Sequence, residues 1–154
     1  MNIAQSMIVI KKLMKNEDCR ALNMLLDRTV ARVCDYLFTE LFPMEEWLTC
    51  DGYMFRKALR KKFLASDYEI VSFMEHYKSH EDSYCCSLDF AREDYRNMKR
   101  SGMTNARNVD EYTTHLTVLH AELVLETLTQ LLAYLEEKYQ IRADQIEMRK
   151  NPQK

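Results

Sequence analysis

Glycine and proline are scarce in this chain. Its 154 residues include 2 glycines and 2 prolines, whereas average usage would give about ten glycines and about seven prolines. Folds rich in β-strands need many tight turns, and those turns depend on these two residue types. The shortage therefore predicts an all-α protein whose helices are joined by short polar connections.

The chain also lacks the motifs with which many enzymes bind phosphate or activate a nucleophile. It contains no glycine-rich phosphate loop, no Gly-x-Ser-x-Gly sequence and no protein-kinase motif. With two glycines, it has little means of bringing backbone amides close to a phosphate or an oxyanion. We therefore expect a protein without catalytic activity and without a bound cofactor.

Paired cysteines and a strong excess of one charge are absent as well. The five cysteines are an odd number without a Cys-x-x-Cys motif, which is typical of reduced thiols in the cytoplasm. Cys85 and Cys86 are adjacent, and we interpret them as core thiols because no base is placed beside them by spacing. The net charge of −2 argues against a general nucleic-acid binder.

Long apolar runs are also missing. None approaches the roughly 18 residues of a membrane span, and the N-terminal stretch lacks the features of a secretory signal. We expect a cytoplasmic protein without membrane contact.

What the chain does have is helical periodicity along most of its length. Apolar residues recur every three or four positions in six segments, which are residues 3–15, 17–42, 53–63, about 67–77, 83–100 and 108–140. Gly102 can end the fifth segment in a left-handed conformation, and Asn108 can cap the start of the sixth. We expect one domain over residues 1–140, an irregular bundle of about five to seven helices built around 17–42 and 108–140. The polar tail 141–154 should fray.

The segment 108–140 carries two apolar faces. Tyr112, Leu116, Leu119 and Leu123 lie within about 60° of each other on a helical wheel. The second face is rotated by roughly 120° and consists of Leu128, Leu131, Leu132, Leu135 and Tyr139. We expect the first face to pack on the helix at 17–42. We expect the second face to bind another copy of the chain or a different protein, because an exposed patch of that size is unusual on a monomer.

A second candidate site is the basic segment 53–63. It holds five positive charges and no acid, on Arg56, Lys57, Arg60, Lys61 and Lys62. A basic helix flanked by aromatic residues could lie along the phosphates of a nucleic acid. It could also bind an acidic protein, dock on the acidic stretch 75–95 of the same chain, or simply be a solvated helix face.

One pair of histidines has the spacing of metal ligands. His76 and His80 are four residues apart, which places both rings on one helix face, and Glu81, Cys85 or Cys86 could add a third ligand. The remaining residues of a known zinc motif are missing. We interpret the two histidines as surface residues and expect no metal.

A second pair, His115 and His120, lies near Glu111 and Glu122 in the long segment. The two histidines are five residues apart, which turns one ring well away from the other. The Glu-x-x-His motif that di-iron bundles repeat on two helices is also absent. We expect no di-iron site here.

These features favour a non-catalytic intracellular protein that acts by binding another macromolecule, as an adaptor, a regulatory subunit or an inhibitor. A nucleic-acid-binding regulator that uses the segment 53–63 is the alternative. A helical metal or thiol enzyme is the third class, and elemental analysis would test it.

Overall fold

A computed structural model describes residues 1–41 and 88–148 of the chain. These residues are mostly helical and contain four α-helices: α1 (Ile3–Lys15), α2 (Cys19–Tyr36), α5 (Leu88–Arg100) and α6 (Val109–Tyr139). A π-helical turn, η1 (Leu37–Leu41), extends α2, and a short 3-10 helix, η4 (Ala143–Gln145), follows α6. In the described ranges there is no strand, only one isolated bridge between Asn2 and Glu147. The all-α prediction is confirmed, whereas a bundle of five to seven helices is not.

Local signals explain where these helices begin and end. Asn108 caps α6, since its side chain accepts a hydrogen bond from the Glu111 amide at 2.9 Å. Gly102 follows α5 with a φ of +70°, as predicted for a left-handed helix end. The predicted helix 17–42 begins later, because Asp18 caps it by accepting from the Ala21 amide at 3.3 Å. Glu17 lies in the turn before it with a φ of +56°.

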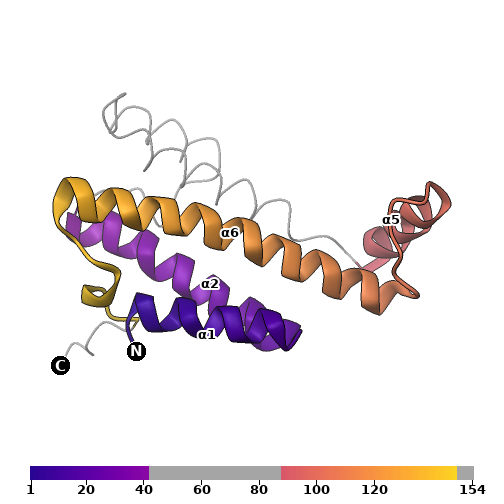
Figure 1. Cartoon of the computed structure of the whole chain (residues 1–154), viewed down its shortest axis with the longest axis horizontal. Helices are drawn as coiled ribbons and strands as arrows, with labels where there is room; N and C mark the ends of the chain where they lie inside the picture. Colours follow the sequence, from indigo (N-terminus) through magenta and orange to yellow (C-terminus); the bar gives the residue numbers. More distant parts are fainter. Residues whose placement is uncertain (42–87, 149–154) are drawn as a thin grey trace.

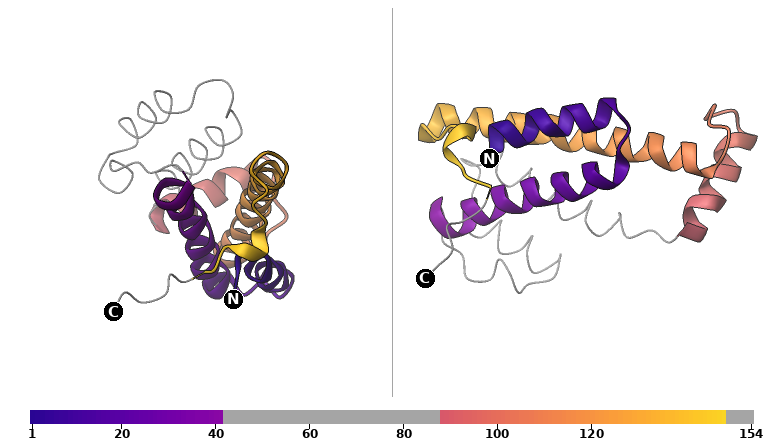
Figure 2. Two further views of the ribbon diagram at one scale, coloured as in Figure 1. Left: turned by 90° about the vertical axis from the view of Figure 1, so that its left-hand side faces the viewer. Right: turned by 90° about the horizontal axis from the view of Figure 1, so that it is seen from below.

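Helices α1, α2 and α6 pack together around the main core. Figure 1 shows that α2 and α6 run in the same direction while α1 runs against both, and the end-on view in Figure 2 shows the three helices as a triangle. The core joins one face of α6 to apolar residues of α1 and α2, including Ile3, Ile10, Leu22, Leu26 and Val33. The Ser6 and Thr29 hydroxyls, both buried, hydrogen-bond to each other across α1 and α2.

The segment that follows α6 folds back onto the start of α1. The Ile3 amide donates to the Ile146 carbonyl at 2.9 Å, and the Ile146 side chain is 1% exposed in the core. Arg32 of α2 donates from Nε to the Glu147 carbonyl at 2.6 Å. The prediction of a frayed tail is therefore wrong for residues 141–148, while 149–154 lie outside the described residues.

Helix α5 forms a separate and smaller contact. It lies beyond the ends of α1 and α2, against the first turns of α6 (Figures 1 and 2). Tyr95 of α5, Ala106 of the connecting loop and Tyr112 of α6 are buried together there, with Met98 and Val109 packed against them. Helix α6 therefore carries the main core on one side and the α5 contact on another.

Helix α6 is also long enough and apolar enough to cross a membrane, by length and composition only. This is weak evidence, because a helix in the core of a folded domain meets the same criterion. Of its most apolar window, 39% is buried within the chain. The absence of membrane contact stays a prediction.

A candidate protein-binding face on α6

The leucines predicted to bind a partner lie in the core of the chain itself. Leu128, Leu131, Leu132 and Leu135 are all at most 7% exposed, and they pack against α1 and α2. Tyr139 is half-buried at the edge of the same cluster. The prediction of an open face at these positions is wrong, because α2 runs beside the C-terminal part of α6 (Figure 1).

The other apolar face of α6 is the one that is open. Leu116, Leu119 and Leu123 are 40%, 52% and 44% exposed, and none of them belongs to either apolar cluster in the described part of the chain. They follow each other at intervals of three and four residues, so they form one row along the helix. We call these three residues the leucine row.

Helix α5 covers only the beginning of this face. Tyr112 is the residue that precedes the leucine row at the same helical spacing, and its ring lies 5.4 Å from that of Tyr95. Its hydroxyl donates to the Asp94 carboxylate. Burial raises the pKa of Tyr112 to about 12, and the hydrogen bond to Asp94 is the second largest cause of this increase. The Tyr95 hydroxyl is also satisfied, because it donates to the Ala106 carbonyl at 2.9 Å.

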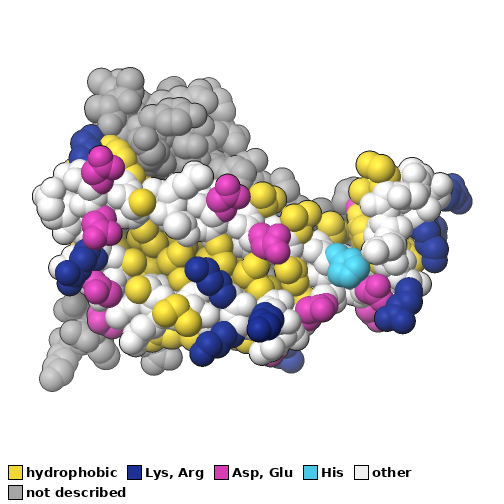
Figure 3. All heavy atoms as spheres, viewed as in Figure 1, with side chains coloured by type: hydrophobic (Ala, Val, Ile, Leu, Met, Phe, Trp, Pro, Cys, Tyr) yellow, Lys and Arg dark blue, Asp and Glu magenta, His cyan; other side chains and the backbone are white. Residues whose placement is uncertain are grey.

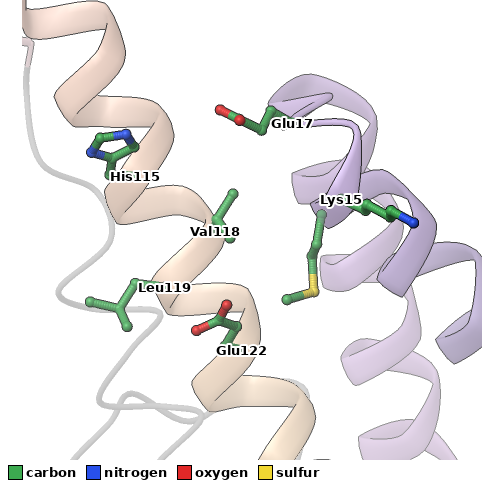
Figure 4. A pocket seen from close by; sticks show the side chains of 7 residues that line it. Lys15, Glu17, His115, Val118, Leu119 and Glu122 are labelled. Atoms are coloured by element: carbon green, nitrogen blue, oxygen red, sulfur yellow. The ribbon is translucent and has the colours of Figure 1, made fainter. Parts of the chain in front are cut away.

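A pocket lies beside the leucine row, between α6 and the turn that joins α1 to α2. Its volume is about 320 Å³, and it is lined by Met14, Lys15, Glu17, His115, Val118, Leu119 and Glu122. Figure 4 shows the Glu17 carboxylate extending toward α6, the Glu122 carboxylate close against α6, and the Lys15 amine pointing away from α6. Because Leu119 belongs to both, the pocket and the leucine row form one continuous surface.

The pocket holds the charged side chains of Lys15, Glu17 and Glu122 beside His115. Within residues 1–41 and 88–148, neither Glu17 nor Glu122 makes an ion pair. Figure 3 shows hydrophobic side chains gathered between α1 and α6, with acidic side chains along the α6 side and basic side chains over α1. The pocket therefore lies where an apolar strip meets acidic side chains of α6 and basic side chains of α1.

Three other predictions concern residues that the structure does not describe. The basic residues Arg56, Lys57, Arg60, Lys61 and Lys62, the histidines His76 and His80, and the cysteines Cys85 and Cys86 all lie outside the described residues.

In the long helix, the residues considered for a di-iron site are used differently. Glu111 accepts a hydrogen bond from Arg107 at 2.9 Å, and this bond is the main cause of its lowered pKa. His115 and Glu122 line the pocket. Among the residues that the structure describes, no group of His, Cys, Asp and Glu side chains is arranged to hold a metal ion.

Sequence reasoning found both faces of α6 but missed Glu17. The helical wheel separated the two apolar sets, but Leu116, Leu119 and Leu123 of the set predicted to pack on 17–42 are exposed, and the set predicted to bind a partner packs in the core. Glu17 gave no signal because it lies in a short polar turn, where nothing local indicates that its side chain reaches toward another helix.

Comparison of the chain with protein-family models, with curated proteins and with solved structures gives no match.

Proposed function

We propose that this chain is a non-catalytic intracellular protein that acts by binding another protein, and that the leucine row is its binding face. The observation that carries the proposal is the exposure of three leucines in one row, on a helix whose other side is fully used by the core. Exposed apolar side chains that lie scattered are ordinary, whereas a contiguous row is typical of interaction sites.

The size of the row fits a modest but useful contribution to binding. Each leucine has about half of its surface left to bury, which is worth about 1 kcal/mol per residue. Three such residues would contribute about 3 kcal/mol, or roughly a hundredfold in the dissociation constant. The rest of the affinity would have to come from groups around the row.

The experiment compares three versions of the protein as bait in extracts of its native cell. The first is the wild type, and the second replaces all three leucines of the row by glutamine, which keeps helix propensity while removing the apolar surface. The third carries Ile8→Gln and Met24→Gln, two equally exposed apolar residues away from the row. Quantitative mass spectrometry should find a protein retained by the wild type and the third version but depleted at least tenfold with the second. Identical sets of retained proteins would refute the proposal.

A second candidate function rests on the sequence alone. The five positive charges without an acid in segment 53–63 favour contact with phosphates. If the segment binds nucleic acid, affinity should fall steeply with salt, and replacement of Arg56, Arg60 and Lys61 by alanine should flatten that dependence. No binding to single-stranded or double-stranded oligonucleotides at low salt would remove this candidate.

A further inference from the structure

We infer that the partner presents an amphipathic helix, whose apolar side lies on the leucine row and whose flanking lysine or arginine enters the pocket that Glu17 and Glu122 help to line. This inference rests on the proposed function and adds the chemistry of the partner. It is carried by the geometry of the row and by the two unpaired carboxylates beside it.

The geometry of the leucine row favours a helix as the bound element. Leu116, Leu119 and Leu123 are spaced by three and then four residues on a continuous α-helix, and the row extends about 10 Å along the axis. A second helix whose apolar residues have the same spacing can pack its side chains between them, as in a coiled-coil seam. Helix α5 ends this seam at Tyr112, so the free length begins at Leu116.

The charges in the pocket determine which side chain of the partner helix can lie next to that seam. In a pair of packed helices, the residues that flank the apolar seam reach across to the neighbouring surface. Here they would reach the pocket that Leu119 shares with Glu17 and Glu122. A lysine or arginine can lay its apolar stem along Met14 and Val118 and pair its charge with one of the carboxylates that line the pocket. An acidic residue at the same place would be repelled by these carboxylates, since the Lys15 amine points away from α6 (Figure 4).

The backbone of Glu17 offers a test that separates binding from folding. Its φ of +56° is a left-handed conformation, which glycine adopts more easily than glutamate. Gly102 occupies such a position after α5, whereas after α1 the residue is a glutamate whose side chain extends into the pocket (Figure 4). Glu17→Gly should therefore stabilise the fold while it removes one of the two carboxylates.

The experiment uses two synthetic peptides with the same leucine spacing. One carries lysine at all other positions and the second carries glutamate there, and fluorescence anisotropy measures the binding of each to the full chain. The lysine peptide should bind at least tenfold more tightly than the glutamate peptide. Glu17→Gly combined with Glu122→Gln should weaken the lysine peptide about tenfold, with an unchanged or higher melting temperature. The matched controls are Gln140→Gly, whose φ is also +56°, and Glu137→Gln at the other end of α6; neither should change binding.

The outcomes separate this inference from the proposed function. If both peptides bind equally and both are lost when the leucine row is replaced by glutamine, the cationic side chain is wrong while the binding face stands. If replacement of the row leaves the binding of the lysine peptide unchanged, the docking surface itself is overturned. Sedimentation that shows a dimer lost with the row, or a photo-crosslinker at position 119 that reacts only within its own chain, would replace the foreign helix by a second copy or by the chain itself.

Discussion

Alanine substitutions at Leu131 and Leu119, made one at a time, should separate the two faces of α6 by their cost in stability. The Leu131 side chain is 1% exposed and packs in the main core, while that of Leu119 is 52% exposed. Truncation of a buried leucine removes its burial and leaves a cavity, at a cost of about 2–5 kcal/mol. Truncation at Leu119 forfeits only a partial burial and should cost no more than about 1 kcal/mol.

Urea unfolding followed by circular dichroism measures this difference directly. With a slope of about 2 kcal/mol per molar urea, Leu131→Ala should lower the midpoint by roughly 1–2.5 M and Leu119→Ala by no more than about 0.5 M. Equal slopes for the two variants would show that neither changes the unfolded state. If Leu119→Ala costs as much as Leu131→Ala, the leucine row is buried in the folded chain, and the reasoning that assigns it to a partner fails.

Four further substitutions test other parts of the structure. Glu17→Gly and Gln140→Gly should each raise the free energy of unfolding by roughly 0.5–1 kcal/mol, because a left-handed residue with a Cβ is strained and glycine is not; a loss of stability in urea melts would contradict the backbone argument. Tyr112 has a pKa raised to about 12 against about 10 when unfolded, so the folded state holds this proton more tightly. The contribution of this raised pKa to the stability of the folded state is present below pH 10 and is lost as the pH rises through 12. Absorbance at 295 nm should show one tyrosine that titrates at higher pH than the others. Asp94→Asn should bring that titration to lower pH. Ile146→Ala should cost about 2–4 kcal/mol and speed hydrogen exchange at the Ile3 amide, whereas unchanged exchange would show that the segment 141–148 is not held on α1.

Local signals in the sequence were sufficient for the ends of several helices. Asn108 and Gly102 act where the sequence predicts them, because caps depend on a few neighbouring residues and on no distant contact. The two faces of α6 were also predictable, since they follow from helical geometry alone. The assignment of a neighbour to each face was not, because the apolar spacing of 17–42 fits either face equally well.

The packing of the tail at residues 141–148 could not be predicted from local sequence either. Ile146 lies in a stretch where apolar residues are few and irregularly spaced, so no periodicity marks it for burial. Its position depends on backbone hydrogen bonds to the start of the chain and on Arg32 in α2, all of which are distant in sequence. The pocket depends in the same way on a turn and a helix that are about a hundred residues apart, and no local pattern indicates that Glu17 and Glu122 line the same pocket.

The central claim, that the leucine row binds another protein, is tested most directly by site-specific photo-crosslinking in the native cell. The photoreactive residue is placed at position 119 in the row or, as a control, at position 24, which is exposed on α2 to a similar degree. The account predicts a cross-link from position 119 to one different protein, absent from position 24 and lost when Leu116 and Leu123 are replaced by glutamine. Cross-links from position 119 that stay within the same chain, or that match those from position 24, would contradict it.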